Sequence, residues 1–276
     1  MYKFGSIIKK IRKDRHLTQK MLAENVCSQS VLSRIENNEE VPNVVVMQQL
    51  CHKLDISIDQ VMNQDSKTIK TNSRWLHLMD YYYRSKDFKQ LKQLIDQESV
   101  EKSLFSDEDY QKYYYYLGSA IYMLDGNLKQ SLELVQKALN ITYTNKKKIV
   151  SDMEILLLSE LGKVYFEMED YEVGDFFLKK SIALFYTIPS ERHQIELTKI
   201  FYNAAVACLN VDKYELALEM INQGINWSRK NNSYYFLDEL LLLKGIVYED
   251  NDQLAEAVKL VEMANIIKII ASNDEL

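Results

Sequence analysis

Residues 17–38 read LTQKMLAENVCSQSVLSRIENN, which predicts two short helices separated by a tight turn. The first helix begins at Thr18-Gln19. Its apolar side consists of Met21, Leu22, Ala23 and Val26. Cys27-Ser28 interrupts the helical spacing, and the second helix then runs from about residue 29 to residue 37. This second helix buries Val31, Leu32 and Ile35. Two helices of this length with this turn are typical of a helix-turn-helix.

The second helix leaves a polar side open to a partner. Hydroxyl, amide and guanidinium side chains there suit hydrogen bonds to base edges and phosphates in the major groove of DNA. The start of the first helix also favours a phosphate, because its backbone N–H groups and its dipole attract an anion. The residues that we expect to contact DNA are Gln19, Ser28, Gln29, Ser30, Ser33 and Arg34. The competing interpretation is a small helical bundle with no nucleic-acid role.

The composition of the 276-residue chain favours an all-α protein. Apolar residues make up 47% of it, enough for a substantial core, and 27% of it is charged. Seven Gly and two Pro are few for this length, whereas strands and hairpins need many turn residues. We therefore expect helices throughout, arranged in one large or two smaller units.

The net charge of −6 conceals a basic N-terminal region. Residues 1–63 carry nine Lys/Arg against seven Asp/Glu, while the remainder carries 25 against 33. Seven basic residues lie within the first 26: Lys3, Lys9, Lys10, Arg12, Lys13, Arg15 and Lys20. A basic patch on an otherwise acidic protein suits contact with a DNA backbone. A solvated helix face would explain the charges taken alone.

Helical spacing divides the chain into two domains and a linker. Residues 1–63 form a five-helix domain in which helices at 3–14, 44–54 and 57–62 accompany the helix-turn-helix. Pro42 marks the start of the fourth helix, and Ser57 is the expected N-cap of the fifth. Residues 64–73 are polar and lack helical spacing, so they form a linker or the start of a linking helix. Residues 74–276 form the second domain.

From Trp75 onward the sequence repeats. Equivalent large residues lie 40, 43, 43 and 40 positions apart; they are Phe88, Leu128, Tyr171, Tyr214 and Leu254. Large and small residues alternate where two helices must cross closely, as in Leu161-Gly162. This resembles the tetratricopeptide repeat with a longer period, and it predicts about five degenerate hairpins in a right-handed superhelix with a concave inner face. An unrelated helical array is the alternative.

Two tyrosine runs, residues 81–83 and 113–116, lie in the first two repeats. Because these helices carry Tyr on every face, some of the rings must pack between hairpins, and we assign Tyr82 and Tyr114 to packing. Tyr83, Tyr113 and Tyr116 fall at the first-helix offsets that line the concave face. Their apolar rings and polar tips suit the binding of a peptide.

The order of domains and the turn of the helix-turn-helix resemble one family. Helix-turn-helix repressors of the Xre class place Gly-Val-Ser between the two helices, whereas residues 24–37 of this chain read ENVCSQSVLSRIEN. The shortened Cys-Ser-x-Ser form that ends in Ser-Arg-Ile-Glu is similar to that of PlcR- and Rgg-type proteins. With about five degenerate repeats behind it, the chain resembles the cytoplasmic peptide-pheromone receptors of Gram-positive bacteria, the RRNPP family, and within it the PlcR-type transcription factors.

The resemblance implies a homodimeric quorum-sensing regulator that binds a palindromic operator and is controlled by a short re-imported peptide on the concave repeat surface. PlcR-type relatives grip the peptide backbone with Asn side chains on first helices, and Asn203 matches such a position. One repeat earlier the corresponding residue is Ser159 or Glu160, so that amide is absent. Further candidates on first helices are Lys163, Phe166, Lys199, Tyr202 and Glu239. Lys163 and Lys199 suit a peptide carboxylate, or are ordinary surface lysines.

Other functional classes find little support in the sequence. The histidines His16, His52, His77 and His193 are isolated, and we recognise no phosphate loop or catalytic triad, so we expect neither an enzyme nor a cofactor or metal. Three distant cysteines and the lack of a membrane-spanning apolar run favour the cytoplasm and no membrane contact. The remaining alternative is a protein-interaction adaptor whose N-terminal domain no longer binds DNA.

Overall fold

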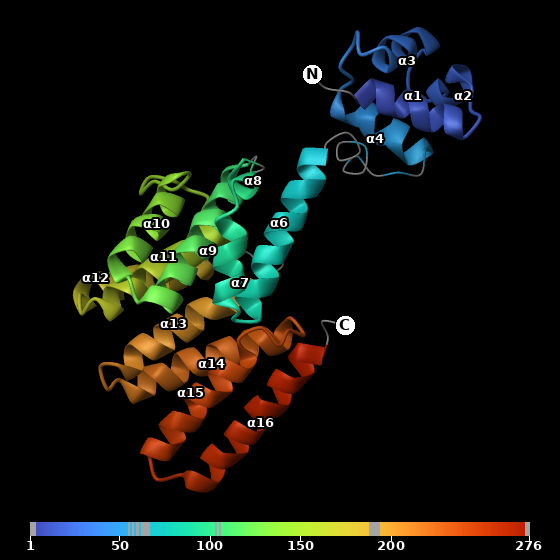
Figure 1. The fold of residues 1–276 in the computed structure, drawn as a ribbon. Coiled ribbons are helices and arrows are strands. Elements are labelled where there is room, and N and C mark those ends of the chain that lie inside the picture. Colours follow the sequence, from blue (N-terminus) through green and yellow to red (C-terminus); the bar gives the residue numbers. More distant parts are fainter. Residues whose placement is uncertain are drawn as a thin grey trace. The chain divides into compact units, whose positions relative to one another are not determined.

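The computed structural model describes residues 4–54, 56, 58, 61, 67–102, 104, 106–187 and 194–273. Every regular element within these ranges is a helix, as the composition predicts (Figure 1). The chain separates into two compact units, residues 1–74 and 75–276.

Short helices with polar N-caps build the first unit. They are α1 (Phe4–Asp14), α2 (Gln19–Ala23), α3 (Gln29–Glu36) and α4 (Val44–Lys53). The side chains of Thr18, Ser28 and Asn43 cap α2, α3 and α4 by accepting a hydrogen bond from a backbone N–H in the first turn. Asn43 is the N-cap of α4, and Pro42 lies directly before that cap. The predicted fifth helix at 57–62 and its cap Ser57 fall mostly outside the described residues.

The core of the first unit places α3 firmly against α1. Leu22, Leu32 and Leu50 from three different helices are fully buried. Gly5 allows close approach, because a Cβ at that position would lie 1.6 Å from the carbonyl oxygen of Ile35. Two expectations about this core are corrected, since Met21 is 54% exposed and Val31 is only partly buried. Val31 still packs against the edge of the core.

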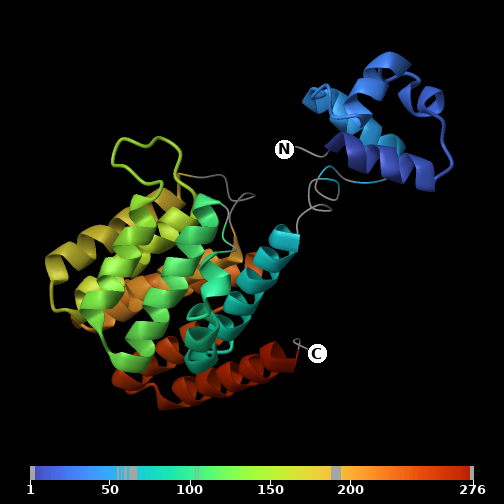
Figure 2. The ribbon, with the colours of Figure 1, turned by 45° about the horizontal axis from the view of Figure 1, so that its top comes forward.

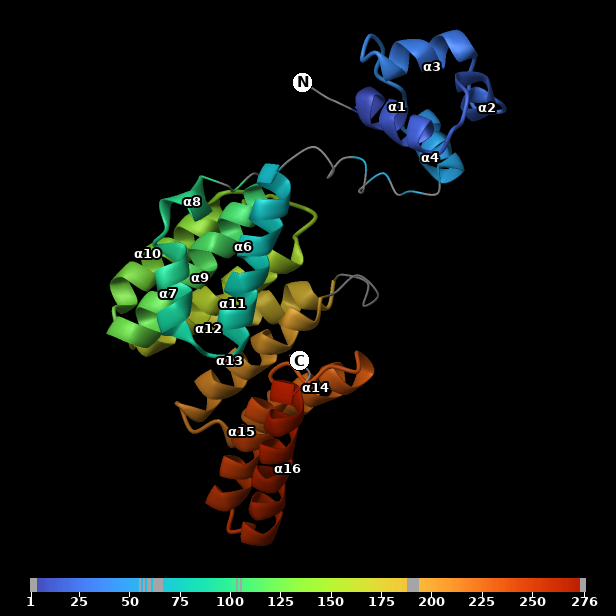
Figure 3. The ribbon, with the colours of Figure 1, turned by 45° about the vertical axis from the view of Figure 1, so that its right-hand side comes forward.

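Five helical hairpins build the second unit, and the helix that opens the first of them begins in residues 67–74 (Figures 1 and 2). The pairs are α6 (Lys67–Arg84) with α7 (Phe88–Ile95), α9 (Asp107–Asp125) with α10 (Leu128–Asn140), α11 (Asp152–Glu167) with α12 (Tyr171–Phe185), α13 (Thr198–Leu209) with α14 (Tyr214–Lys230), and α15 (Leu237–Asp250) with α16 (Leu254–Asn273). Two short elements, α8 (Glu98–Glu101) and η2 (Ile195–Leu197), lie in the connections. The hairpins stack in chain order (Figure 3).

The repeat predicted from the sequence is confirmed residue by residue. Each of the five marker residues, from Phe88 to Leu254, is the first residue of the second helix in its hairpin. A Cβ on Gly162 would lie 2.6 Å from Leu178 Cγ and 2.9 Å from the Gly174 carbonyl oxygen, so α11 and α12 cross at close range. Residues 67–73 belong to α6, so this part of the expected linker is the start of a helix and not a loop. No helix among the described residues is long and apolar enough to cross a membrane.

Candidate functional sites

The outer side of α3 carries the polar residues expected to meet DNA. Gln29, Ser30 and Arg34 are exposed, and Ser33 is half-buried beside them. Ser28 Oγ lies 2.9 Å from Ser30 Oγ and accepts from Val31 N, so its hydroxyl is committed to the start of the helix. The Arg34 Nε lies 2.8 Å from Glu40 Oε2 in an exposed ion pair. Such a pair is weak in water, so the guanidinium can exchange this partner for a phosphate or a base.

A buried ion pair beneath α3 sets the position of that helix. Arg12 on α1 donates from Nε to Glu36 Oε1 at 2.6 Å and from a terminal nitrogen to Oε2 at 2.9 Å. Gln19 Nε2 donates to the same carboxylate at 2.8 Å. Burial acts to raise the pKa of Glu36, but the hydrogen bonds from Arg12 and Gln19 outweigh it and hold that pKa below its usual range. This arrangement ties α1, α2 and α3 together.

Because of this ion pair, Arg12 does not belong to the expected basic patch, and the role expected for Gln19 changes. Arg12 is 8% exposed, so it is a structural residue and does not belong to a phosphate-binding surface. The side-chain amide nitrogen of Gln19 donates to Glu36. A phosphate would therefore meet the backbone N–H groups at the start of α2 and not this side chain. The exposed basic residues of this region are Lys10, Lys13, Arg15 and Lys20. Lys3 lies outside the described residues.

In the second unit, the first helices of four successive hairpins meet in a buried polar cluster, which we call the inner network. It consists of Tyr83, Tyr115, Ser159, Glu160, Lys199 and Asn203. Lys199 Nζ donates to Glu160 Oε2 and to Tyr115 Oη, both at 2.7 Å, and also to Tyr83 Oη. The two tyrosine oxygens lie 2.7 Å apart. Side chains from α6, α9, α11 and α13 thus share one ammonium group.

Both partners of the central ion pair remain charged despite burial. Burial would raise the pKa of Glu160, but Lys199 and then Lys163 outweigh it and lower that pKa to about 2. Burial would likewise lower the pKa of Lys199, and the Glu160 carboxylate instead raises it well above the usual value. Lys199 is 4% exposed and therefore is not the ordinary surface lysine allowed by the sequence.

Asn203 is held in one orientation by this network. Its Nδ2 donates to Ser159 Oγ at 3.1 Å and to Glu160 Oε2 at 3.4 Å. Among the described residues its Oδ1 has no hydrogen-bond partner, although the side chain is 1% exposed. A buried acceptor without a donor is costly. The amide oxygen of Asn203 is therefore the group in this cluster that would gain most from a donor on a ligand.

The other predicted ligand residues are dispersed. Tyr116 donates to Asp80 Oδ1 at 3.1 Å and contacts Tyr83, whereas Tyr113 packs in the hydrophobic core, where burial raises its pKa to about 12. Phe166 joins a separate apolar cluster and lines a different cavity between α12, α13 and α14. Lys163, Tyr202 and Glu239 are partly exposed; Lys163 lies over the Tyr122 ring, and Glu239 pairs with Lys86. Tyr82 and Tyr114 pack against the core, as assigned.

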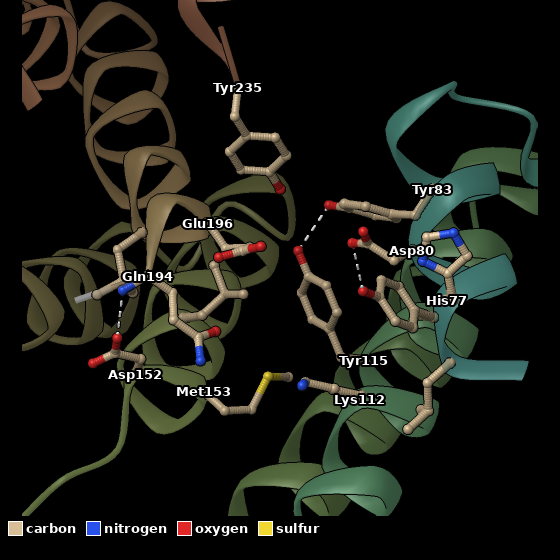
Figure 4. Close-up of a pocket in the computed structure, with 14 residues that line it drawn as sticks. His77, Asp80, Tyr83, Lys112, Tyr115, Asp152, Met153, Gln194, Glu196 and Tyr235 are labelled. Atoms are coloured by element: carbon tan, nitrogen blue, oxygen red, sulfur yellow. Dashed lines mark hydrogen bonds between the residues drawn. The ribbon is translucent and has the colours of Figure 1, made fainter. Parts of the chain in front are cut away.

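A cavity of about 240 Å³ adjoins the inner network (Figure 4). Tyr83, Tyr115 and Tyr235 point toward one another at its wall, from three different parts of the chain. Asp80 and Glu196 lie at its border; Glu196 accepts a hydrogen bond from Arg84, and Asp80 Oδ2 forms an ion pair with Arg84 Nε at 2.8 Å. Sequence reasoning missed Tyr115, Arg84, Glu196 and Tyr235. Only Tyr115 had a signal, as the third residue of a tyrosine run; the others meet through contacts across more than a hundred residues. Within the described ranges, no group of three His, Cys, Asp or Glu side chains is placed to hold a metal ion.

Known proteins resemble this chain in both of its units. Residues 8–61 match the helix-turn-helix family model, so the first unit contains a helix-turn-helix domain. The crystal structure of Bacillus thuringiensis PlcR in complex with the peptide PapR7 and DNA superposes with a TM-score of 0.79 at 24% identity, covering 100% of this chain and 99% of that one. The chain has the fold of PlcR.

Two further solved structures share this fold along nearly the whole chain. ComR from S. thermophilus, in complex with DNA and its signalling peptide ComS, has a TM-score of 0.55 at 15% identity and covers 98% of this chain and 95% of that one. The Streptococcus dysgalactiae SHP pheromone receptor Rgg2 has a TM-score of 0.57 at 17% identity, with 99% and 95% covered. No curated protein sequence is similar enough to match.

Proposed function

We propose that this protein is a cytoplasmic quorum-sensing transcription regulator of the PlcR type in the RRNPP family. It binds a palindromic operator as a homodimer, and a short re-imported signalling peptide on the inner repeat surface controls it. The observation that carries the proposal is the full-length likeness in fold to PlcR, which was crystallised with both a peptide and DNA. The role consists of binding and involves no catalysis.

The surface of α3 supports the DNA-binding part of the proposal. Gln29 and Ser30 are exposed at its N-terminal end, the end that enters the major groove in a helix-turn-helix. We propose that Gln29, Ser30 and Ser33 read base edges and that Arg34 contacts a base or a phosphate. The start of α2 at Gln19 and Ser28 at the start of α3 face the phosphate backbone.

The inner network supports the peptide-binding part. The unpaired Oδ1 of Asn203 suits a backbone N–H of an extended peptide, and Tyr83, Tyr116 and Tyr202 offer aromatic walls on the first helices. Ser159 and Lys199 act by orienting Asn203 and its neighbour Glu160. We propose Lys163 and Glu239, which are partly exposed, as polar contacts at the edge of the same surface.

The last helix supports the homodimer. The terminal helix of a repeat array normally presents a polar outer face, because nothing covers it. On α16, however, the apolar side chains of Leu254, Val258 and Ile266 are 60%, 58% and 57% exposed. A second copy of the chain would cover such a face, and a dimer gives two recognition helices for the two halves of a palindrome.

The test of the function begins with operator selection. Full-length protein is used to select duplexes from a random DNA pool at about 50 mM and about 200 mM salt. We expect one class of sequences with inverted symmetry, bound by a dimer in light scattering. No retention of DNA at either salt concentration would favour the adaptor instead, and retention without any sequence preference would remove sequence readout by α3.

The peptide site is tested by calorimetric titration with a synthetic peptide, taken from the C-terminal residues of a short secreted-peptide reading frame beside the gene. Asn203→Ala should weaken binding by about 1–3 kcal/mol, because a peptide N–H loses its acceptor. Asn222→Ala on α14, which removes only an exposed hydrogen bond to Lys244, serves as the matched control. Wild-type affinity of Asn203→Ala, with unchanged fluorescence of the folded state, would place the site elsewhere.

A further inference from the structure

The tip of the first hairpin contacts the connection that precedes the fourth hairpin and the first helix of the fifth hairpin. Arg84, the last residue of α6, donates to Glu196 Oε1 on η2 at 2.6 Å, and Lys86 in the following turn pairs with Glu239 on α15. These contacts join positions 112 and 153 residues apart. In a simple repeat array each hairpin contacts only its neighbours. The first hairpin here instead reaches the far end of its array.

An aromatic segment between α14 and α15 completes this contact. The guanidinium of Arg84 lies 4.9 Å from the centre of the Tyr235 ring, and the Phe236 ring lies 5.0 Å from that of Tyr202. Phe236 has a φ of +56°, a left-handed conformation that bulky side chains rarely adopt. Such a conformation persists only where surrounding contacts hold it. The rings therefore keep this segment against the first helices.

The inner network lies between these two sets of contacts. Lys199 bonds to Tyr83, the residue before Arg84, while Asn203 is next to Tyr202, which contacts Phe236. Tyr235 itself lines the cavity, and its ring points toward Tyr83 (Figure 4). Asn203 itself is 1% exposed, so no peptide reaches its free oxygen in this arrangement.

We propose that Arg84 and Lys86, with Glu196, Glu239 and Tyr235, form a latch that closes the inner surface in the absence of a ligand. The proposal rests on the proposed peptide-binding function and concerns regulation of that same site. A peptide reaches Asn203 only after both ion pairs separate and Tyr235 moves from the cavity wall. Part of the binding energy of the peptide is then used to open the latch, which lowers its apparent affinity.

The latch differs from the inner network in its exposure to salt. Side chains of the Arg84–Glu196 pair are 30% and 31% exposed, and those of the Lys86–Glu239 pair are 55% and 19% exposed. The Lys199–Glu160 pair is only 4% and 3% exposed. Dissolved ions screen accessible pairs much more than buried ones. Salt should therefore open the latch while the inner network stays intact.

The test measures hydrogen exchange of backbone amides in the full-length protein without any peptide. The variant is Glu196→Gln with Glu239→Gln, and the control is Asp175→Asn, which breaks an exposed ion pair with Lys179 on α12. Loss of each ion pair of the latch should raise the amide exchange rate about fivefold. The increase should occur in both segments, residues 84–88 and residues 232–239. Raising the salt from about 0.01 M to about 1 M should do the same to the wild type.

Two outcomes would overturn the latch. One is exchange that stays at the wild-type rate in the double variant; the other is faster exchange in one of the two segments alone, which would show that they do not open together. The control should match the wild type in both segments. Because no peptide or DNA is present, a failure here removes the latch and leaves the proposed function standing. Failure of operator selection, in turn, leaves the exchange result unaffected.

Discussion

Lys199→Met should turn the inner network into a pH-dependent weak point of the repeat unit. The substitution keeps much of the apolar stem of Lys199 and removes the ammonium group that Glu160, Tyr83 and Tyr115 share. Glu160 is then a buried carboxylate that has lost its main opposing charge. Breaking a buried ion pair in this way costs about 3–5 kcal/mol when the remaining group stays charged.

Protonation of Glu160 limits the cost of the substitution and makes that cost depend on pH. In the wild type the folded pKa of Glu160 is about 2, below its ordinary value of 4.5, so its contribution to stability is complete above pH 4.5 and is lost as the pH falls toward 2. Without Lys199, burial raises the folded pKa above 4.5, so the folded state binds a proton that the unfolded state has released. Above pH 4.5 the cost of the substitution rises by about 1.36 kcal/mol per pH unit, so it is about 3 kcal/mol larger at pH 7 than at pH 4.5.

The assay is urea unfolding followed by tryptophan fluorescence at about pH 5 and about pH 7.5. Both tryptophans, Trp75 and Trp227, lie in residues 75–276, so the signal reports the repeat unit alone. Lys199→Met should lose more stability at the higher pH, and adding Glu160→Gln should abolish that difference. Lys163→Met is the control, because Lys163 lies 3.6 Å from Glu160, is more exposed and leaves Lys199 in place. A loss for Lys199→Met that is the same at both pH values would refute the reasoning.

Three further predictions concern the recognition helix, its support and the repeat packing. Gln29→Ala should weaken binding to the selected operator by about 1–3 kcal/mol and leave binding to random DNA nearly unchanged, as measured by fluorescence anisotropy; equal losses on both DNAs would remove its role in readout. Glu36→Ala should leave Arg12 buried and unpaired, costing about 3–5 kcal/mol and melting the first unit in circular dichroism while the tryptophan transition stays in place; a single unchanged melt would contradict this. Gly162→Ala should cost about 1–3 kcal/mol in the urea assay, because its Cβ would lie 2.6 Å from Leu178 Cγ. Gly245→Ala, whose Cβ would lie 3.5 Å from its nearest neighbours, in ordinary contact, should be neutral or slightly stabilising, and equal effects of the two would show that the crossing is not tight.

The elements of this protein were predictable because their signals are local. The helix-turn-helix follows from apolar spacing and from caps such as Thr18 and Ser28, which act within a single turn of helix. The repeat markers from Phe88 to Leu254 locate the second helix of every hairpin, because each hairpin must bury the same face against its own partner. Asn203 was identified by resemblance to a family position, and its surroundings still had to be found in the structure.

Side-chain roles were decided by tertiary structure where they depend on burial and on distant partners. Arg12 resembles its basic neighbours in sequence, yet packing of α1 against α3 buries it on Glu36. Tyr113 and Phe166 share first helices with residues of the inner network but pack elsewhere, because helix rotation within the stack selects which face turns inward. The sequence by itself determined a helix-turn-helix followed by helical hairpins, since periodicity and capping are short-range. Only the tertiary structure decided that Lys199 meets Tyr83 and that Lys86 meets Glu239, because the curvature of the whole array sets which of its ends can touch.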